Sequence, residues 1–99
     1  MKLIIAVVRP FKLDEIVTAL EEIEGFPGMT VLNSEGFGQR IRSSATDALD
    51  PFKPNKRIEV IVTDEKVECV VSAIKNSAHP GKKGDGLISV LPVDSVTMI

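Results

Sequence analysis

The chain opens with a run of apolar residues, Leu3 to Val8, that is continuous instead of alternating and is stopped by Pro10. A strand of this kind is covered on both faces, which predicts a position in the middle of a sheet. After Pro10 the apolar residues recur at helical spacing, and acidic residues occupy the first turn, where the helix dipole favours them. We therefore expect a helix from Leu13 to Glu24, whose apolar stripe is Leu13, Ile16, Val17, Leu20 and Ile23.

The rest of the chain repeats this layout. A glycine-flanked break after the first helix precedes a second strand, Met29 to Glu35, and Ile58 to Val62 predicts a third. Asp64 is the expected N-cap of a second helix, which ends where proline and glycine follow Ala78. Its stripe is Val67, Val70, Val71, Ile74 and Ala78. Leu87 to Leu91 predicts a fourth strand, which Val93 to Ile99 could extend.

The order strand, helix, strand, strand, helix, strand predicts an α+β fold of the ferredoxin-like βαββαβ type. Right-handed crossovers place both helices on one face of a four-stranded antiparallel sheet. We expect a single domain over residues 1–99. The strands are apolar on both sides, so the other sheet face would be a large exposed patch in a monomer. This predicts an oligomer whose sheets pack face to face or edge to edge.

A glycine-rich basic segment, His79-Pro80-Gly81-Lys82-Lys83-Gly84-Asp85-Gly86, separates the second helix from the last strand. Glycine allows successive N–H groups to turn toward one point, and the two lysines add positive charge, so the segment can bind an anion. It can equally be a tight connection in which Gly81 is the helix C-cap. The glycine spacing matches neither the Walker pattern nor the dinucleotide fingerprint.

The hydrophobic pattern fades between Gln39 and Lys56, which predicts a long loop. Loops of this length are usually functional or disordered. The basic residues of this segment outnumber the acidic ones, which fits an anion site or a solvated flexible segment equally well. The basic residues are Arg40, Arg42, Lys53 and Lys56, and the acidic ones are Asp47 and Asp50.

Composition narrows the classes of function. The 99 residues carry a net charge of −2, which argues against nucleic acid or an anionic membrane as the main partner. The aromatic residues are four phenylalanines without tyrosine or tryptophan, so a base-stacking platform has little support. The N-terminal apolar run is too short for a membrane span. Cys69 is the only cysteine and is expected to be a buried thiol in a reducing compartment, which favours a cytoplasmic protein.

Candidate catalytic groups are sparse. His79 is the only histidine and has no second ligand at metal spacing, so we expect no metal site. Neither a serine with a neighbouring base nor a pair of carboxylates stands out, which argues against an enzyme. Glu59 is the unusual carboxylate, because a charge among Ile58, Val60 and Ile61 must either point to solvent or find a donor in a cleft.

Four segments, in this order along the chain, resemble the PII signal-transduction proteins, trimeric regulators that bind adenine nucleotides in clefts between subunits. These segments are Arg9-Pro10-Phe11-Lys12-Leu13-Asp14, Gly28-Met29-Thr30-Val31 with Gly36-Phe37-Gly38, Arg57-Ile58-Glu59-Val60, and Gly81-Lys82-Lys83-Gly84-Asp85-Gly86. The resemblance runs nearly end to end. It implies the same ferredoxin-like fold, a homotrimer, and a long T-loop, here residues 39–56, that contacts partner proteins.

The resemblance also implies site residues by position. Those that would bind ADP, AMP or ATP are Val7, Thr30, Gly36, Phe37, Gly38, Gln39, Arg40, Glu59, Ile61, Lys83, Gly84, Asp85 and Gly86. Those of the partner-binding loop would be Arg42, Ser43, Ser44 and Lys53. No tightly bound cofactor is expected.

Several positions depart from the family pattern. The family has arginine then glutamine after Gly-Phe-Gly, where this chain has Gln39 and Arg40. Leu87 and Met98 stand where the family has a lysine and an arginine, and the sequence ends at Ile99 before a second such arginine. The loss of these cations weakens the case for ATP and favours ADP, AMP or another small anion. The T-loop is shorter and contains no tyrosine, which rules out tyrosine uridylylation.

The sequence thus predicts a divergent PII-like regulator whose ligand orders the T-loop for a partner, such as a transporter or an enzyme. The response to 2-oxoglutarate should be weak, because Arg40 cannot ligate the magnesium ion that a glutamine would hold in the family. Two alternatives share the fold. One is a trimeric ion-tolerance protein of the CutA type, and the other is a small enzyme such as a phosphatase.

Overall fold

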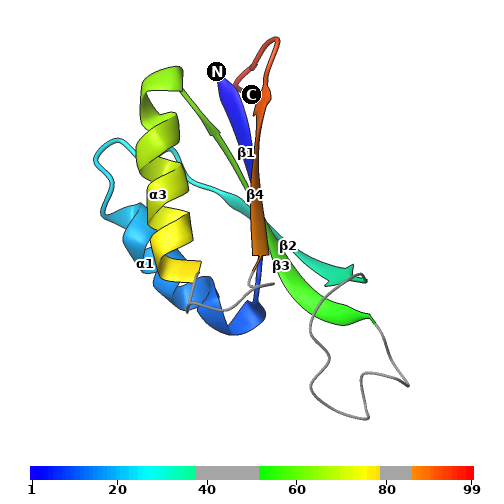
Figure 1. Cartoon of the computed structure of the whole chain (residues 1–99). Coiled ribbons are helices and arrows are strands. Elements are labelled where there is room, and N and C mark those ends of the chain that lie inside the picture. The colour runs from blue at the N-terminus through cyan, green and yellow to red at the C-terminus, as the bar shows by residue number, and fades with distance from the viewer. Residues whose placement is uncertain (38–51, 79–85) are drawn as a thin grey trace.

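In the computed structural model, which describes residues 1–37, 52–78 and 86–99, two helices cover one face of a four-stranded sheet (Figure 1). The strands are β1 (Lys2–Val8), β2 (Thr30–Gly36), β3 (Lys53–Val62) and β4 (Gly86–Pro92). The helices are α1 (Leu13–Glu21) and α3 (Val67–Ala78), each preceded by a short 3₁₀ turn, Pro10–Lys12 and Asp64–Lys66. This is the predicted ferredoxin-like βαββαβ arrangement.

The strand order is β2-β3-β1-β4, and every pairing is antiparallel. The continuous apolar run of β1 therefore lies inside the sheet, between β3 and β4, as predicted. Its register sets Val8 opposite both Lys56 and Gly86, and Lys2 opposite both Val62 and Pro92. The paired part of β3 continues past the end of β1, so that its first residues and the end of β2 form a two-stranded hairpin stem.

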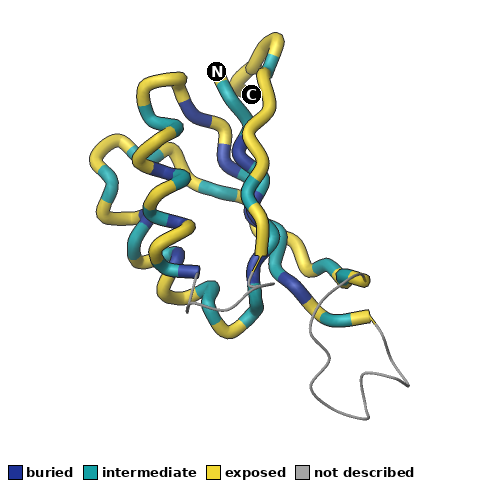
Figure 2. Tube along the Cα trace, in the orientation of Figure 1, coloured by how far each residue is buried: buried dark blue, intermediate teal, exposed yellow. Residues whose placement is uncertain are grey.

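The core lies between the sheet and the helices. Alternate residues of β1 and β3 are buried, because successive side chains of a strand point to opposite faces. They pack against the apolar stripes of α1 and α3 in one cluster. In Figure 2 the buried segments follow the surfaces where helices and sheet face each other, whereas β4 is mostly exposed or intermediate. The fully buried side chains include Ile4, Val8, Ile16, Leu20, Ile58, Val60, Val70 and Ile74.

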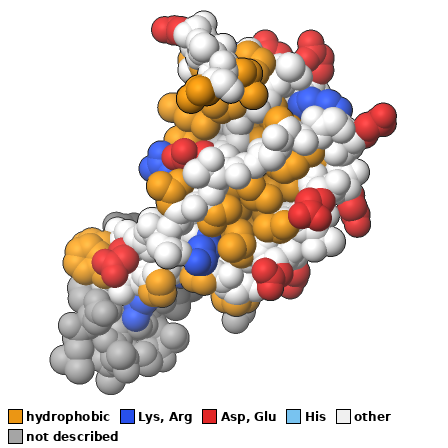
Figure 3. Space-filling view, turned by 180° about the vertical axis from the view of Figure 1, so that it is seen from behind, with side chains coloured by type: hydrophobic (Ala, Val, Ile, Leu, Met, Phe, Trp, Pro, Cys, Tyr) orange, Lys and Arg blue, Asp and Glu red, His pale blue; other side chains and the backbone are white. Residues whose placement is uncertain are grey.

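The opposite sheet face, which we call the helix-free face, carries the other set of side chains. In the central strands these are Leu3, Ile5 and Val7 of β1 and Arg57, Glu59 and Ile61 of β3. The strand register adds Leu87 and Leu91 of β4 and Thr30 and Leu32 of β2 to the same face. Several of its apolar members are exposed, Leu87 at 57% and Ile61 at 38%. In the view from behind, which shows the sheet and the helices together and does not look squarely onto the helix-free face, hydrophobic side chains occupy much of the middle of the molecule (Figure 3).

Several sequence predictions about element ends are wrong. The first helix ends at Glu21 instead of Glu24, and the residues that follow Glu21 form turns. The third strand begins at Lys53, so Lys53 to Lys56 belong to β3 and not to the loop. Residues 93–99 add no strand; within the described ranges, the Val93 N–H donates a backbone hydrogen bond to the Met1 carbonyl at 3.3 Å.

Two residue predictions in the second helix are also wrong. The N-cap is Thr63, with extended backbone, and Asp64 is the first residue of the 3₁₀ turn. Cys69 is exposed, and its thiol lies 3.2 Å from the Lys66 carbonyl oxygen. The apolar stripe of α3 passes through Val70 and Ile74, one and five residues further on, so a helix of 3.6 residues per turn directs Cys69 away from the core.

Candidate functional site

Glu59 forms an ion pair with a residue of its own strand. Arg57 Nε donates a hydrogen bond to Glu59 Oε2 at 2.9 Å, and the side chains are 43% and 32% exposed. Residues two apart in a strand point to the same face, so the pair lies on the helix-free face among apolar neighbours. The carboxylate that the sequence singled out is therefore half-buried and ion-paired. Sequence analysis missed Arg57 as its partner, although the i, i+2 spacing was a usable signal.

Four residues that the family resemblance assigned to nucleotide binding share the helix-free face. Thr30 is directly opposite Glu59 across the β2–β3 pairing, and Ile5 is opposite Glu59 on the other side. Ile61 follows two residues along β3, opposite Leu3. Val7 lies on the same face, opposite Arg57. The fold therefore brings side chains from three strands onto one surface, with Thr30, Glu59 and Ile61 in one group.

A second group of assigned residues lies at the end of the sheet where the hairpin stem begins. Gly86 opens β4 beside Val8, and Gly36 closes β2 opposite Lys53. Phe37 follows, and its ring packs on that of Phe52 with centroids 5.3 Å apart and an interplanar angle of 41°. This aromatic pair joins the two strand ends that flank residues 38–51.

Gly86 is fixed by its backbone. Its φ is 153°, a backbone angle that residues other than glycine rarely adopt. A Cβ at this position would overlap the carbonyl oxygen of Val7. The last residue of the predicted glycine loop therefore must be glycine to let β4 begin against β1.

Within one chain the two groups are not contiguous. Ile61 is opposite Leu3, four residues along β1 from Val7, which corresponds to about 13 Å of strand. Gly36 is opposite Lys53, and Val7 is opposite Arg57. Lys53 and Arg57 are also four residues apart, along β3. Gly36 and Ile61 therefore lie toward opposite ends of β3, with Val7 between the two groups.

Cations gather near the hairpin end of the sheet. Arg57 and Lys56 are opposite Val7 and Val8, and Lys53 is further along β3. Lys56 Nζ donates to Asn33 Oδ1 at 2.6 Å across the stem. Lysine and arginine side chains at one end of a sheet suit an anionic ligand, but Lys56 and Arg57 are consecutive in β3 and so point to opposite faces of the sheet. The described residues contain no cluster of three histidine, cysteine or acidic side chains that could hold a metal ion.

Two hollows lie near these groups. One of about 490 Å³ is found at the hairpin stem, with Pro10, Asn33, Glu35, Pro54 and Lys56 among its lining residues. Another of about 320 Å³ lies between α3 and β4 and includes Gly86 in its wall. Neither contains Thr30, Glu59 or Ile61.

The remaining residues predicted for the site lie outside the described part of the chain. They are Gly38, Gln39, Arg40, Lys83, Gly84 and Asp85 of the nucleotide set, and Arg42, Ser43 and Ser44 of the partner-binding set. Lys53, the other residue of the partner-binding set, lies in β3. Neither helix in the described part of the chain has the length and apolar run required to cross a membrane.

Comparison with known proteins addresses the family directly. The sequence profile of the family "Nitrogen regulatory protein P-II" matches residues 1–99. Proteins of that name from Azospirillum brasilense and Rhizobium meliloti (strain 1021) are 42% and 41% identical to this chain over 104 residues. A third, from Klebsiella oxytoca, is 40% identical over 103 residues. Each alignment covers 100% of this chain and 91% of the relative. The chain therefore belongs to the P-II family of nitrogen regulatory, signal-transduction proteins.

Proposed function

We propose that the chain is a homotrimeric cytoplasmic regulator that binds an adenine nucleotide, ADP, AMP or ATP, or a small anion in clefts between its subunits. Ligand binding controls residues 39–56, which contact a partner protein such as a transporter or an enzyme. The observation that carries this proposal is the shared face of Val7, Thr30, Glu59 and Ile61. Residues that the family uses for nucleotide come from three strands and yet point to one surface.

The helix-free face supports the trimer. Leu3, Ile5 and Val7 of the central strand are only half-buried although they stand in the middle of the sheet. Their burial against a second copy would remove apolar surface from water at about 25 cal/mol per Å². We propose that this contact brings Thr30, Glu59 and Ile61 of one copy near the hairpin end of another, so that both groups of site residues line one cleft.

The role is regulatory instead of catalytic. P-II proteins are regulators, and the family match covers the whole chain. In the described residues the carboxylate on the proposed surface, Glu59, is paired with Arg57. No observation favours the CutA-type or phosphatase alternatives.

The preferred ligand is expected to carry fewer phosphates than ATP. The protein is expected to respond weakly to 2-oxoglutarate. The cations that the family places on the phosphates are replaced by Leu87 and Met98, whose side chains are exposed and apolar. Arg40 stands where the magnesium-binding glutamine would be. An arginine has only donors, so it can pair with a phosphate or a carboxylate and cannot ligate a metal ion.

Calorimetric titration tests this proposal. ADP and AMP should each bind saturably to the full chain, and ATP with magnesium should bind no more tightly than ADP. Addition of 2-oxoglutarate to the ATP and magnesium titration should leave the affinity unchanged. Absence of binding for all three nucleotides would overturn the proposed ligand class, and tight magnesium-dependent 2-oxoglutarate binding would overturn the interpretation of Arg40.

A further inference from the structure

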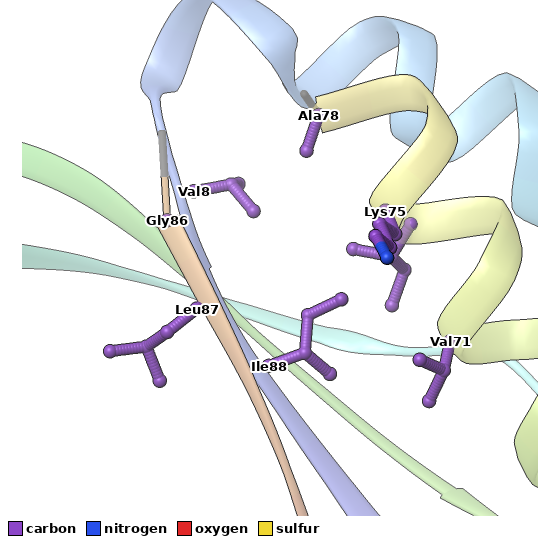
Figure 4. Close-up of a pocket in the computed structure, with 8 residues that line it drawn as sticks. Val8, Val71, Lys75, Ala78, Gly86, Leu87 and Ile88 are labelled. Atoms are coloured by element: carbon purple, nitrogen blue, oxygen red, sulfur yellow. The ribbon is translucent and has the colours of Figure 1, made fainter. Parts of the chain in front are cut away.

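The hollow between α3 and β4, which we call the α3–β4 groove, shares Gly86 with the residues assigned to the nucleotide and is otherwise lined by different residues. Its volume is about 320 Å³, and its walls include Val8, Val71, Ile74, Ala78 and Ile88. In Figure 4 the Ala78 side chain points from the last turn of α3 into the space near Val8, and Ile88 points toward α3. Leu87 points away from the helix.

The groove exists because two positions at its end are small. Ala78 follows Ile74 by one helical turn on the buried stripe of α3, and it fills less of the space above the sheet than a larger residue would. Gly86 faces it from the start of β4 and cannot carry a side chain, because a Cβ would overlap the Val7 carbonyl. Ile74 and Val8 are 0% and 1% exposed, so these walls are parts of the rigid core.

The lining selects an apolar ligand. A hollow bounded by aliphatic side chains offers water few hydrogen-bond partners, and even fully enclosed apolar cavities of about 150 Å³ can bind benzene; the α3–β4 groove is open to solvent, so a ligand can enter it directly. The α3–β4 groove is larger than such cavities and lies near the lower end of the range of ligand pockets, about 300–1,000 Å³. It therefore has space for a short aliphatic chain.

Among the described residues that line the groove, Lys75 is the charged one. Lys75 lines it while remaining exposed, and in the described part of the chain its ammonium forms no ion pair. An apolar space whose described lining includes one cation without an ion pair is complementary to a molecule with an aliphatic body and an anionic end. We infer that the α3–β4 groove binds a small, soluble aliphatic carboxylic acid, with its chain against Val71 and Ile88 and its carboxylate at Lys75.

The test is a methyl NMR titration of the full chain with octanoate, octan-1-ol and phosphatidylglycerol vesicles. Octanoate should shift the methyl signals of Val8, Val71, Ile74 and Ile88 saturably and leave those of Ile23 and Ile61 in place. Octan-1-ol should bind the same methyls more weakly, and the vesicles should shift none of them. Equal affinity for acid and alcohol, or binding to the vesicles, would overturn the assignment of a soluble carboxylic acid.

Two variants with matched controls test the geometry. Ala78→Leu fills the groove and should weaken octanoate binding at least tenfold, whereas Ser72→Leu adds the same side chain at an exposed position of α3 and should not. Lys75→Gln should weaken octanoate about two- to fivefold, as expected for an exposed ion pair, and leave octan-1-ol unchanged. Lys2→Gln, at the opposite end of β1, is its control.

If Ala78→Leu fails to fold, Ile88→Met, which changes the wall without closing the space, replaces it. Octanoate should then still bind, with its largest shift moved from residue 88 to Val71. Unsaturable shifts, or shifts spread equally over groove and control methyls, would show that the chain has no octanoate site.

Discussion

Gly86 joins the last strand to the core at a point where no side chain fits. In Gly86→Ala the new Cβ would meet the Val7 carbonyl, and the backbone would also be strained at a φ of 153°. We expect the free energy of unfolding to fall by about 2–4 kcal/mol. Urea denaturation at fixed chain concentration measures this.

Gly28→Ala is the matched control, because Gly28 has a φ of 110° but open space, with no atom within 4 Å, where the new Cβ would stand. Only the backbone strain applies there, at a cost of about 1 kcal/mol. An equal loss in the two variants would show that the contact with Val7 has no energetic weight.

Glu65 provides a pH-dependent contribution at the start of the second helical region. Its pKa is lowered below the ordinary value of 4.5, chiefly by a hydrogen bond from its own backbone N–H and then by one from the Thr63 hydroxyl. A lowered folded-state pKa means that the stabilisation is present above pH 4.5 and is lost as the pH falls through the folded-state pKa. Glu65→Gln should therefore flatten the loss of stability below about pH 4.5. Thermal unfolding from pH 7 to 3 is the measurement, with Glu68→Gln as control; parallel curves for wild type and Glu65→Gln would contradict the assignment.

At the scale of elements, the Phe37–Phe52 contact holds the hairpin stem together beyond the end of β1. The residues are 63% and 51% exposed, and their rings pack with centroids 5.3 Å apart. Phe52→Leu should lower the free energy of unfolding by about 0.5–1 kcal/mol. Backbone amides of the β2–β3 stem should exchange faster, while those of the β1–β4 pairing keep their protection.

Phe11→Leu is the control for the same loss of an exposed ring, because Phe11 is 71% exposed and lies outside the stem. Faster exchange throughout the sheet in Phe52→Leu, or in both variants alike, would mean that the aromatic pair has no local role.

The hydrophobic pattern was sufficient to predict the elements that are buried. The continuous run of β1 and the helical stripes of α1 and α3 report burial directly, and their order determines the ferredoxin-like topology. The pattern was insufficient for Lys53 to Lys56, where polar residues adopt a strand because they pair with β2. Such cross-strand context outweighs local propensity.

The sequence predicted which residues share the face of the candidate site, but not how far apart the groups of site residues lie. The motifs around Thr30 and Glu59 identified residues that do share a face. The separation of these residues from Gly36 and Gly86 follows from strand register, which no local pattern specifies. The exposure of Cys69 was available in principle from its phase relative to Val70 and Ile74.

At the scale of the whole molecule, the helix-free face should be the contact between copies. Ile61 lies on this face and is 38% exposed, whereas Val31 lies on the helix side of β2 and is 40% exposed. The two residues are therefore equally buried within one chain and differ only in the face on which they lie. Ile61→Lys should prevent assembly, because it would bury an unpaired charge at the contact. Val31→Lys should leave the trimer intact. Light scattering distinguishes these outcomes, and a trimer that survives Ile61→Lys would remove this face from the interface.

The central claim is that copies of this chain associate and that nucleotide binds between them. Native mass spectrometry with ADP tests both parts in one spectrum, because it counts chains and ligands together. We predict a species of three chains carrying up to three ADP molecules, and the loss of both the trimer and the ADP in Ile61→Lys. ADP bound to single chains, or a trimer that takes up no adenine nucleotide at saturating concentration, would contradict this claim.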